Sequence, residues 1–355
     1  MLLETLSRST LSTEVSANVH QDGNTDPGGS IALTGQRGNL NYLFSGAVTS
    51  NYQRSDSFET SLHGDLSLNE YIDLNRITDS TEYSFNSSLA WTPTANDRIA
   101  INMQFGVSEP ETRVDRLYTD FNAAEPFNYT EREAIPSDNE NWEVGGDYEH
   151  TFASGNRFKA LFIVNEKTDD ILRERFLTDF IGGPERQILY LDTDSRYRER
   201  IVRSSIVTNL APNQGLEYGI EGAQTIQDSN LVLARPGPGP GDPNLGGLTP
   251  VPLPNANSTV EEIRIEPFII HNWQINPRMS LESSVVAEWS EIKQSGDLSN
   301  KRDFDYVKPK LDYRFDISNS LQFSASLEKV VSQLSFGDFS RNTNERDDDE
   351  DTKAG

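Results

Sequence analysis

The sequence predicts an all-β fold, an antiparallel transmembrane β-barrel that is incomplete. Three observations lead to this prediction. Apolar and polar residues alternate along many segments, short and long connections alternate between these segments, and aromatic residues gather beside the short connections. A period of two indicates strands rather than helices. Tight turns at one end of the strands and long loops at the other are typical of outer-membrane barrels.

The composition excludes several classes of function. The 355 residues include 31 basic and 56 acidic side chains and no cysteine, and the net charge is −25. Without cysteine there is no disulfide, no thiol nucleophile and no cysteine-ligated metal. Because phosphate recognition depends on clustered Lys and Arg, we expect no nucleic-acid partner. The chain also lacks an apolar run of the length that a transmembrane helix requires.

The alternation divides the chain into about thirteen strands. After Arg98, for example, Ile101 and Phe105 lie on one face and Asn102 and Gln104 on the other. The predicted strands begin near Thr13, Ser30, Leu40, Thr81, Arg98, Asn141, Arg157, Arg196, Leu216, Val260, Met279, Phe304 and Leu321. Bacterial single-chain barrels have even strand numbers, so this count predicts a barrel that is not closed by this chain alone.

The connections predict which end of each strand faces which compartment. Short turns are expected at Gly35–Asn39, Pro93–Asp97, Ala153–Asn156, Pro212–Gly215, Asn276–Arg278 and Ser318–Ser320. Long polar loops are expected at Asp56–Ser80, Pro110–Asn139, Thr168–Ser195, Leu233–Ser258 and Gln294–Asp303. In an outer-membrane barrel the short turns are periplasmic and the long loops are extracellular.

An aromatic girdle is predicted beside the short turns. It consists of Trp91, Phe152, Phe158, Trp273, Phe315 and Phe323, each of which has the parity of the apolar face of its strand. Such girdles lie where the apolar band of a barrel meets the lipid headgroups. A soluble sandwich also alternates, but it gives no reason for aromatic residues to gather at one end.

The charged side chains of opposite parity are the candidate solute-facing residues. They are Glu143, Asp147, Glu149, Arg157, Lys159, Glu217, Glu221, Glu262, Arg264, Glu266, Lys308, Lys310 and Arg314. In a barrel these residues line the lumen. We interpret most of them as a solvated face, or as partners of charges on neighbouring strands, rather than as binding residues.

The carboxy-terminal third resembles a known family, the TonB-dependent outer-membrane receptors. Two segments carry the resemblance: Tyr306–Asp316, read as YVKPKLDYRFD, and Glu328–Phe339, read as EKVVSQLSFGDF. The final Ala354 and Gly355 resemble the start of the family's Ala-Gly-Asn-Pro element. Earlier strands agree only in their alternation.

The resemblance implies a barrel of 22 strands, closed by an amino-terminal plug whose TonB box contacts the inner-membrane TonB complex. No plug, TonB box or signal peptide is recognisable before Leu11, so no energy-coupling residue is assigned to this chain. We therefore expect residues 1–10 to be a remnant or linker, 11–340 to be a partial barrel, and 341–355 to be an acidic extracellular loop that is cut short.

Other motifs give weaker signals. The proline-rich segment Arg235–Pro243 fits either an extended recognition segment or, as we favour, a mobile outer loop. The acidic run Asp347–Asp351 lacks the spacing of a calcium loop. His20, His63, His150 and His271 are dispersed, and His150 and Glu149 face opposite sides of a strand, so we expect no metal, no cofactor and no catalytic residue.

Three functions remain open. The resemblance implies a non-enzymatic receptor in the bacterial outer membrane, with lipid, TonB and a large or scarce solute as partners; such solutes include a ferric siderophore, a cobalamin-like cofactor or an oligosaccharide. A passive porin fits the same strand pattern. The third candidate is a soluble extracellular β protein, acting as an adhesin or carbohydrate-binding module.

Overall fold

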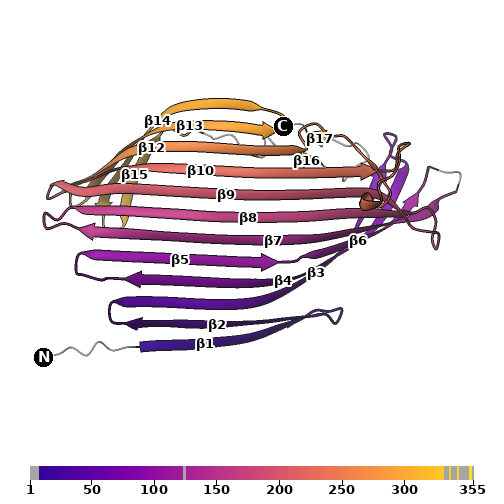
Figure 1. Ribbon diagram of the computed structural model, residues 1–355, viewed down its shortest axis with the longest axis horizontal. Coiled ribbons are helices and arrows are strands. Elements are labelled where there is room, and N and C mark those ends of the chain that lie inside the picture. The colour runs from indigo at the N-terminus through magenta and orange to yellow at the C-terminus, as the bar shows by residue number, and fades with distance from the viewer. Residues whose placement is uncertain (1–7, 123–124, 332–335, 337–341, 344–351, 354–355) are drawn as a thin grey trace.

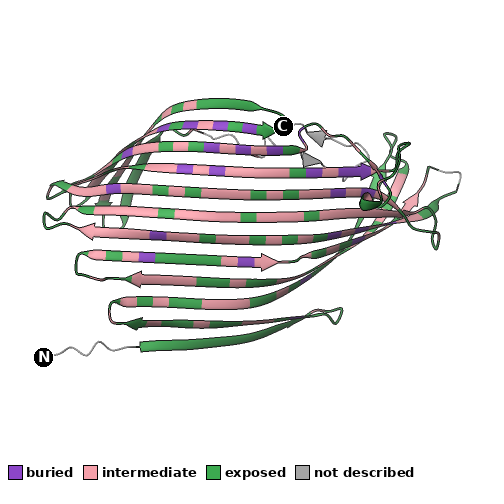
Figure 2. Ribbon diagram, viewed as in Figure 1, coloured by how far each residue is buried: buried purple, intermediate pink, exposed green. Residues whose placement is uncertain are grey.

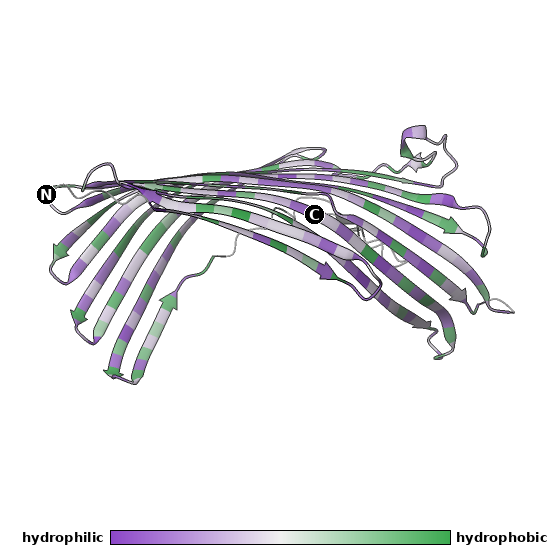
Figure 3. Ribbon diagram, turned by 90° about the horizontal axis from the view of Figure 1, so that it is seen from below, coloured by the Kyte–Doolittle hydropathy of each residue, from purple (hydrophilic) through white to green (hydrophobic). Residues whose placement is uncertain are grey.

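The computed structural model describes residues 8–122, 125–331, 336, 342–343 and 352–353. Nearly all of these residues belong to one antiparallel sheet, which bends into an arch (Figures 1 and 3). No helix within the described ranges has the length and hydropathy needed to cross a membrane. The acidic run at 347–351 and most of the segment after 331 lie outside the described residues.

Most strands are long. In chain order they are β1 (Arg8–Val19), β2 (Thr25–Arg37), β3 (Leu40–Leu62), β4 (Leu68–Trp91), β5 (Asp97–Ser108), β6 (Glu111–Asp120), β7 (Phe127–Thr151), β8 (Arg157–Thr178), β9 (Arg186–Ala211), β10 (Gln214–Arg235), β11 (Thr249–Pro250), β12 (Asn257–Asn276), β13 (Met279–Gly296), β14 (Asn300–Ser318) and β15 (Leu321–Glu328). A 3-10 turn, η1 (Pro243–Leu245), precedes β11, and the two-residue strands β16 (Asn342–Thr343) and β17 (Thr352–Lys353) pair with each other.

The all-β prediction is confirmed. Thirteen strands follow one another across the sheet in the order β1-β2-β3-β4-β5-β7-β8-β9-β10-β12-β13-β14-β15, which matches the thirteen predicted segments. The short strand β6 continues β5 in the same register, and both lie between β4 and β7. Pro110 separates them, because proline has no N–H to donate to the ladder.

The sheet is open within the described residues. β1 and β15 are the two ends of the strand order, and neither pairs with the other. Every residue of β1 is exposed, including Val15 at 90%. Inside a bilayer such edges need partners, because unsatisfied backbone groups in hydrocarbon cost several kcal/mol each.

The short turns lie where they are predicted, but most of the predicted long loops are wrong. Strands β3 and β4 extend through Asp56–Ser80 to a tight turn at 63–67, and β13 and β14 leave only 297–299 between them. The predicted loops Pro110–Asn139 and Thr168–Ser195 are likewise mostly strand. The prediction ended each strand where its apolar alternation ended. Paired strands surrounded by water need no apolar face, so their ladders continue beyond that point.

The two faces of the sheet differ in chemistry and in crowding. Figures 2 and 3 show burial and hydropathy changing from residue to residue along the strands. Direct cross-strand partners lie on the same face, so the register assigns each residue to a side. On the apolar face Ile101, Ile265 and Trp289 remain 44%, 46% and 52% exposed. On the polar face Ser205 and Glu288 are only 5% and 2% exposed. Because side chains converge on the inside of a bend, the more crowded polar face is the concave one.

The apolar face is apolar only near the short turns. We call this region the apolar band; it ends at a row of polar residues on the same face, namely Glu140, Glu166, Arg200, Glu261, Glu291 and Asp305. In β5 the band covers about nine residues, Ile99–Val107, or about 30 Å along the strand. A typical barrel tilt of about 40° reduces this to about 23 Å, close to the usual apolar height.

A substitution at Gly219 measures how tightly the concave face is packed. A Cβ atom at Gly219 would lie 2.2 Å from the Ser204 carbonyl oxygen and 2.8 Å from the Phe268 ring. We expect Gly219→Ala to lower the free energy of unfolding by about 1–3 kcal/mol through overpacking. Urea unfolding followed by tryptophan fluorescence measures this.

The matched control is Gly222→Ala on the same strand. A Cβ at Gly222 meets nothing within 4 Å. We expect a change within about 0.5 kcal/mol. Equal destabilisation by both variants would contradict the assigned packing.

Candidate functional site

The register places all thirteen candidate lumen residues on the concave face. Glu149 faces Lys159 across β7 and β8, and Lys159 faces Ser205 on β9. The same alternation carries this face through β10 and β12 to Lys308 on β14. This surface extends over seven strands, β7, β8, β9, β10, β12, β13 and β14. It brings together residues that are more than 150 positions apart in the sequence.

Lys308 forms one end of a continuous series of ion pairs. Its Nζ lies 2.5 Å from Glu266 Oε1 on β12 and 2.7 Å from Glu288 Oε2 on β13. The Glu288 side chain is only 2% exposed and also accepts a hydrogen bond of 3.1 Å from the Ser290 hydroxyl. Lys308 is thus the cation that neutralises two partly buried carboxylates.

The series continues through two arginines. Arg264 Nε lies 3.0 Å from Glu266 Oε2, and Arg264 Nη2 lies 4.0 Å from Glu221 Oε1. Arg203 Nη1 lies 3.4 Å from Glu221 Oε2. The Arg203 guanidinium also stacks over the Phe268 ring, 3.9 Å from its centre, which adds a cation–π contact.

Lys159 forms the other end. Its Nζ lies 3.8 Å from Glu217 Oε2, and Glu217 is also 4.0 Å from Arg203 and accepts a 2.8 Å hydrogen bond from Ser205. We call this series the charge ladder. It consists of Lys159, Arg203, Arg264 and Lys308 with Glu217, Glu221, Glu266 and Glu288, and its formal charge is therefore zero.

The other predicted lumen residues lie beside the charge ladder. The structure pairs Asp147 with Arg98, Glu149 with Arg157, Lys310 with Asp312, and Arg314 with Asp316. Glu262 is buried further from the short turns. Glu143 is exposed and makes no ion pair among the described residues. The concave face therefore presents ion pairs and few free charges.

The predicted girdle residues lie on the opposite, apolar face. Trp91 pairs with Ile99, Trp273 lies beyond Ile269 with the same parity, and Phe315 pairs with Phe323. Phe158 faces His150, whose ring in turn contacts that of Phe152 at 4.7 Å. All six aromatic residues lie at the short-turn end of the sheet.

A second aromatic margin was missed by sequence reasoning. Trp142 faces Glu166, and Trp289 faces Asp305, so both indoles mark the far edge of the apolar band. Tyr83, 54% exposed, lies at the same level on β4. The parity of these three aromatic residues, together with their distance from the short turns, could have predicted this margin from the sequence. The band thus has aromatic residues at both margins, as lipid-embedded barrels do.

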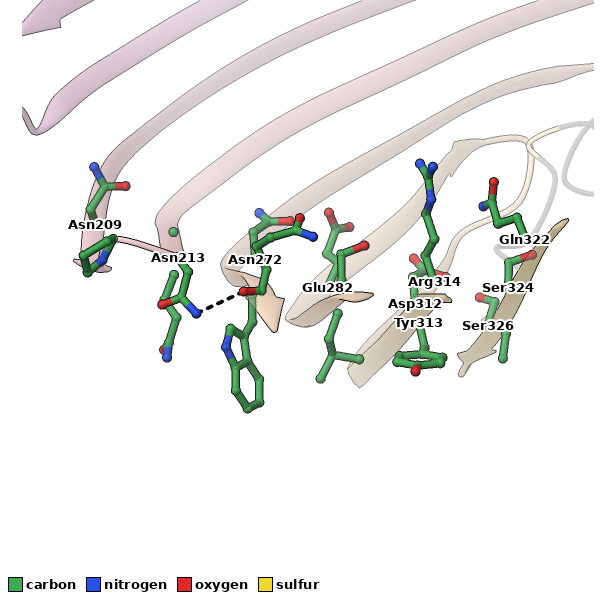
Figure 4. Close-up of a pocket in the computed structure, with 18 residues that line it drawn as sticks. Asn209, Asn213, Asn272, Glu282, Asp312, Tyr313, Arg314, Gln322, Ser324 and Ser326 are labelled. Atoms are coloured by element: carbon green, nitrogen blue, oxygen red, sulfur yellow. Dashed lines mark hydrogen bonds between the residues drawn. The ribbon is translucent and has the colours of Figure 1, made fainter. Parts of the chain in front are cut away.

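The short-turn end of the concave face contains a hollow of about 860 Å³. Amides and hydroxyls dominate its lining. Figure 4 shows Asn272, Glu282, Arg314 and Gln322 projecting to one side of the sheet, while Tyr313 projects to the other. This lining offers many hydrogen-bond donors and acceptors and suits a hydrated passage.

His150 has a structural role at the short turns. Its Nδ1 lies 2.7 Å from Asp97 Oδ1, which also accepts a 2.8 Å hydrogen bond from the Tyr148 hydroxyl. Hydrogen bonds from Thr94, His150 and Tyr148 lower the pKa of Asp97 to about 2. Within the described residues no group of three or more histidine or acidic side chains is arranged to hold a metal ion.

A second charged cluster on the concave face was missed entirely. Arg116 Nη1 lies 2.6 Å from Glu131 Oε1, and Arg116 Nη2 lies 3.1 Å from Glu133 Oε2. Arg175 Nη2 lies 2.8 Å from Glu133 Oε1, and Arg173 Nε lies 4.0 Å from the same oxygen. These residues belong to stretches that the sequence analysis assigned to loops, so their alternation was not considered.

The segment that follows the proline-rich loop packs against the sheet. Leu189, Leu191, Leu231 and Leu233 form a buried cluster next to Arg173 and Arg175, and Val251 and Leu253 pack on it. β11 pairs with the end of β10, and the Asp242 side chain caps η1. The mobile outer loop expected at Arg235–Pro243 stays a prediction, because 236–241 are exposed and it is the later residues 249–253 that strand pairing and apolar burial anchor.

Comparisons with known proteins give only distant similarities. The chain is similar to the toluene transporter TodX of Pseudomonas putida, with 6% identity, a TM-score of 0.30, and coverage of 87% of this chain and 82% of that one. It is also similar to the ferric enterobactin receptor PfeA of Pseudomonas aeruginosa, with 9% identity, a TM-score of 0.19, and coverage of 92% and 76%. No family model and no curated protein matches the chain. These TM-scores are too low to assign a function.

The charge ladder predicts unequal roles for two lysines of β14. Replacing Lys308 by Met leaves Glu288 without its cation and leaves Glu266 with Arg264 alone. We expect the free energy of unfolding to fall by about 2–4 kcal/mol, somewhat less than for a fully buried pair. Urea titration of the purified chain measures this.

Lys310→Met is the control, because the Lys310 and Asp312 side chains are 39% and 37% exposed. We expect a change of about 0–1 kcal/mol there. The double variant Lys308→Met with Glu288→Gln should recover part of the loss. Equal effects at Lys308 and Lys310 would show that the ladder does not stabilise the sheet.

Proposed function

We propose that this sheet forms part of the wall of an outer-membrane barrel and that a polar solute passes along its concave face. The observation that carries the proposal is the apolar band. It is exposed, about 23 Å high after tilt, and has aromatic residues at both margins, while the opposite face is charged and paired. Transport rather than catalysis is the role that this arrangement favours.

A soluble adhesin is the less suitable candidate. Monomeric soluble proteins rarely expose contiguous apolar patches larger than a few hundred Å². Here exposed apolar side chains occur in every long strand from β1 to β15. A bilayer covers such a surface without a protein partner.

The transport mechanism that we propose is TonB-dependent uptake. Its support is the resemblance of Tyr306–Asp316 and of the segment that begins at Glu328 to that receptor family. The first segment lies in β14, which forms the last hairpin of the long sheet with β15. The second segment begins at Glu328, the last residue of β15, so only that residue belongs to the hairpin. Residues 332–335 and 337–339 of the second segment lie outside the described residues.

Substitutions at Ile101 and Asn102 test the membrane placement. Ile101 lies on the apolar face, and Arg there should block insertion into lipid vesicles at a cost of about 2–4 kcal/mol near the midplane. Phe105→Arg should act in the same way. Asn102 faces the concave side, so Asn102→Arg should insert like the parent. Equal insertion of all three variants would refute the assigned faces.

Energy dependence separates the receptor from a passive porin. In cells that make the protein, we expect solute uptake to stop when a protonophore collapses the inner-membrane gradient. A porin continues to equilibrate solutes under the same conditions. Undiminished uptake with the protonophore, or steady conductance of the pure protein in a planar bilayer, would favour the porin.

A further inference from the structure

The concave face carries an unusual arginine at its far end. Arg76 lies on β4 and faces Val114 on β6, which in turn faces Glu133 on β7. Arg76 is exposed, and it makes no ion pair or hydrogen bond with the described residues. Most cations of the concave face are paired; Arg76 and Arg302 on β14 are two exposed arginines of this face for which the described residues offer no ion pair.

Arg116 is the neighbour that completes a pair of cations. It faces Leu74, two residues before Arg76, so the two arginines are diagonal neighbours on adjacent strands. Diagonal neighbours are within reach of each other's long side chains. Unlike Arg76, Arg116 is fixed, because Glu131 and Glu133 hold its two Nη atoms at 2.6 and 3.1 Å.

Arginines hold the buried carboxylates of this region. Glu133 also contacts Arg175 and Arg173. Burial raises the pKa of Glu133, but Arg175 and Arg116 outweigh it, so the pKa is lowered and the carboxylate remains charged. The Nε atom of Arg173 is buried and has no hydrogen-bond partner among the described residues. Three arginines, Arg116, Arg173 and Arg175, thus contact the two buried carboxylates of Glu131 and Glu133.

An aromatic surface adjoins the arginines. Tyr118, two residues after Arg116 on the same face, stacks on Tyr129 with ring centres 4.5 Å apart and planes 5° from parallel. The Tyr129 hydroxyl donates a 2.7 Å hydrogen bond to Glu70, which occupies that carboxylate. Ile72 faces Tyr118 from β4. The pair therefore offers a fixed apolar surface next to Arg116, with Arg76 four residues further along β4 from Ile72.

We propose that Arg76 and Arg116 bind the carboxylate of an organic anion whose apolar or aromatic body lies on Tyr118 and Ile72. Arginine suits this task because its planar guanidinium donates two parallel hydrogen bonds to a carboxylate. The inference names a class of solute for the proposed transport function and rests on that function for its role. The binding site itself is argued from the geometry alone.

The test uses two matched probes, 1-naphthoate and its neutral amide, 1-naphthamide. Each is titrated calorimetrically into the full chain in detergent, and the heat of a detergent blank is subtracted. We expect the parent chain to bind the acid more tightly than the amide. Arg76→Gln should weaken binding of the acid about tenfold and leave the amide unchanged.

Arg113→Gln is the matched control. Arg113 lies on β6 next to Ile77, on the opposite face, and pairs with Asp115 at 2.8 Å. The Arg113→Gln variant loses one positive charge, as Arg76→Gln does, but on the opposite face of the sheet. Binding of the acid should therefore not change. If Arg76→Gln and Arg113→Gln act alike, or if acid and amide bind equally to the parent, the proposal is overturned.

Tyr118→Leu tests the aromatic surface separately. It should weaken the acid and the amide by a similar factor, and unchanged binding of both would overturn this part of the proposal. Circular dichroism of each variant verifies the strand content. Because binding is measured in detergent, it does not depend on passage across a membrane. Loss of transport with intact binding would contradict the proposed function, and the reverse would contradict only the anion site.

Discussion

The antiparallel hydrogen-bond register determines which residues of this chain meet. Each residue faces its cross-strand partner on the same side of the sheet, so a shift of one residue would exchange the two faces. A single register carries the concave face from Glu149 on β7 to Lys308 on β14. The apolar band, the charge ladder and the arginine cluster all depend on this alignment.

The concave face requires charges that balance one another. Burying a carboxylate such as Glu288 without a cation is costly, and Lys308 offsets that cost through two short contacts. The charge ladder is neutral although the chain carries a net charge of −25. The acidic excess therefore lies elsewhere, part of it in 347–351, and the ladder remains a balanced polar surface, as the proposed passage of a solute requires.

The strands divide into two regions with different physical requirements. Near the short turns, one face exposes apolar residues such as Ile101 and Ile265, which the proposed function places against lipid. Beyond Glu140 and Glu166 both faces are polar, and the strands are held by backbone ladders, by ion pairs such as Arg116 with Glu131, and by the leucine cluster under Val251. This outer region contains the free arginine at position 76.

The sequence by itself determined the fold class, the thirteen strands and the facing of the thirteen charges and six aromatic residues, because alternation is a local property of the strand. It did not predict the strand extensions through Asp56–Ser80 and Pro110–Asn139, since polar paired strands carry no apolar period. Only the tertiary structure decided that Arg203 joins Glu217 and Glu221, and that Arg116 lies beside Arg76. Such contacts depend on register between distant segments, which no local pattern encodes.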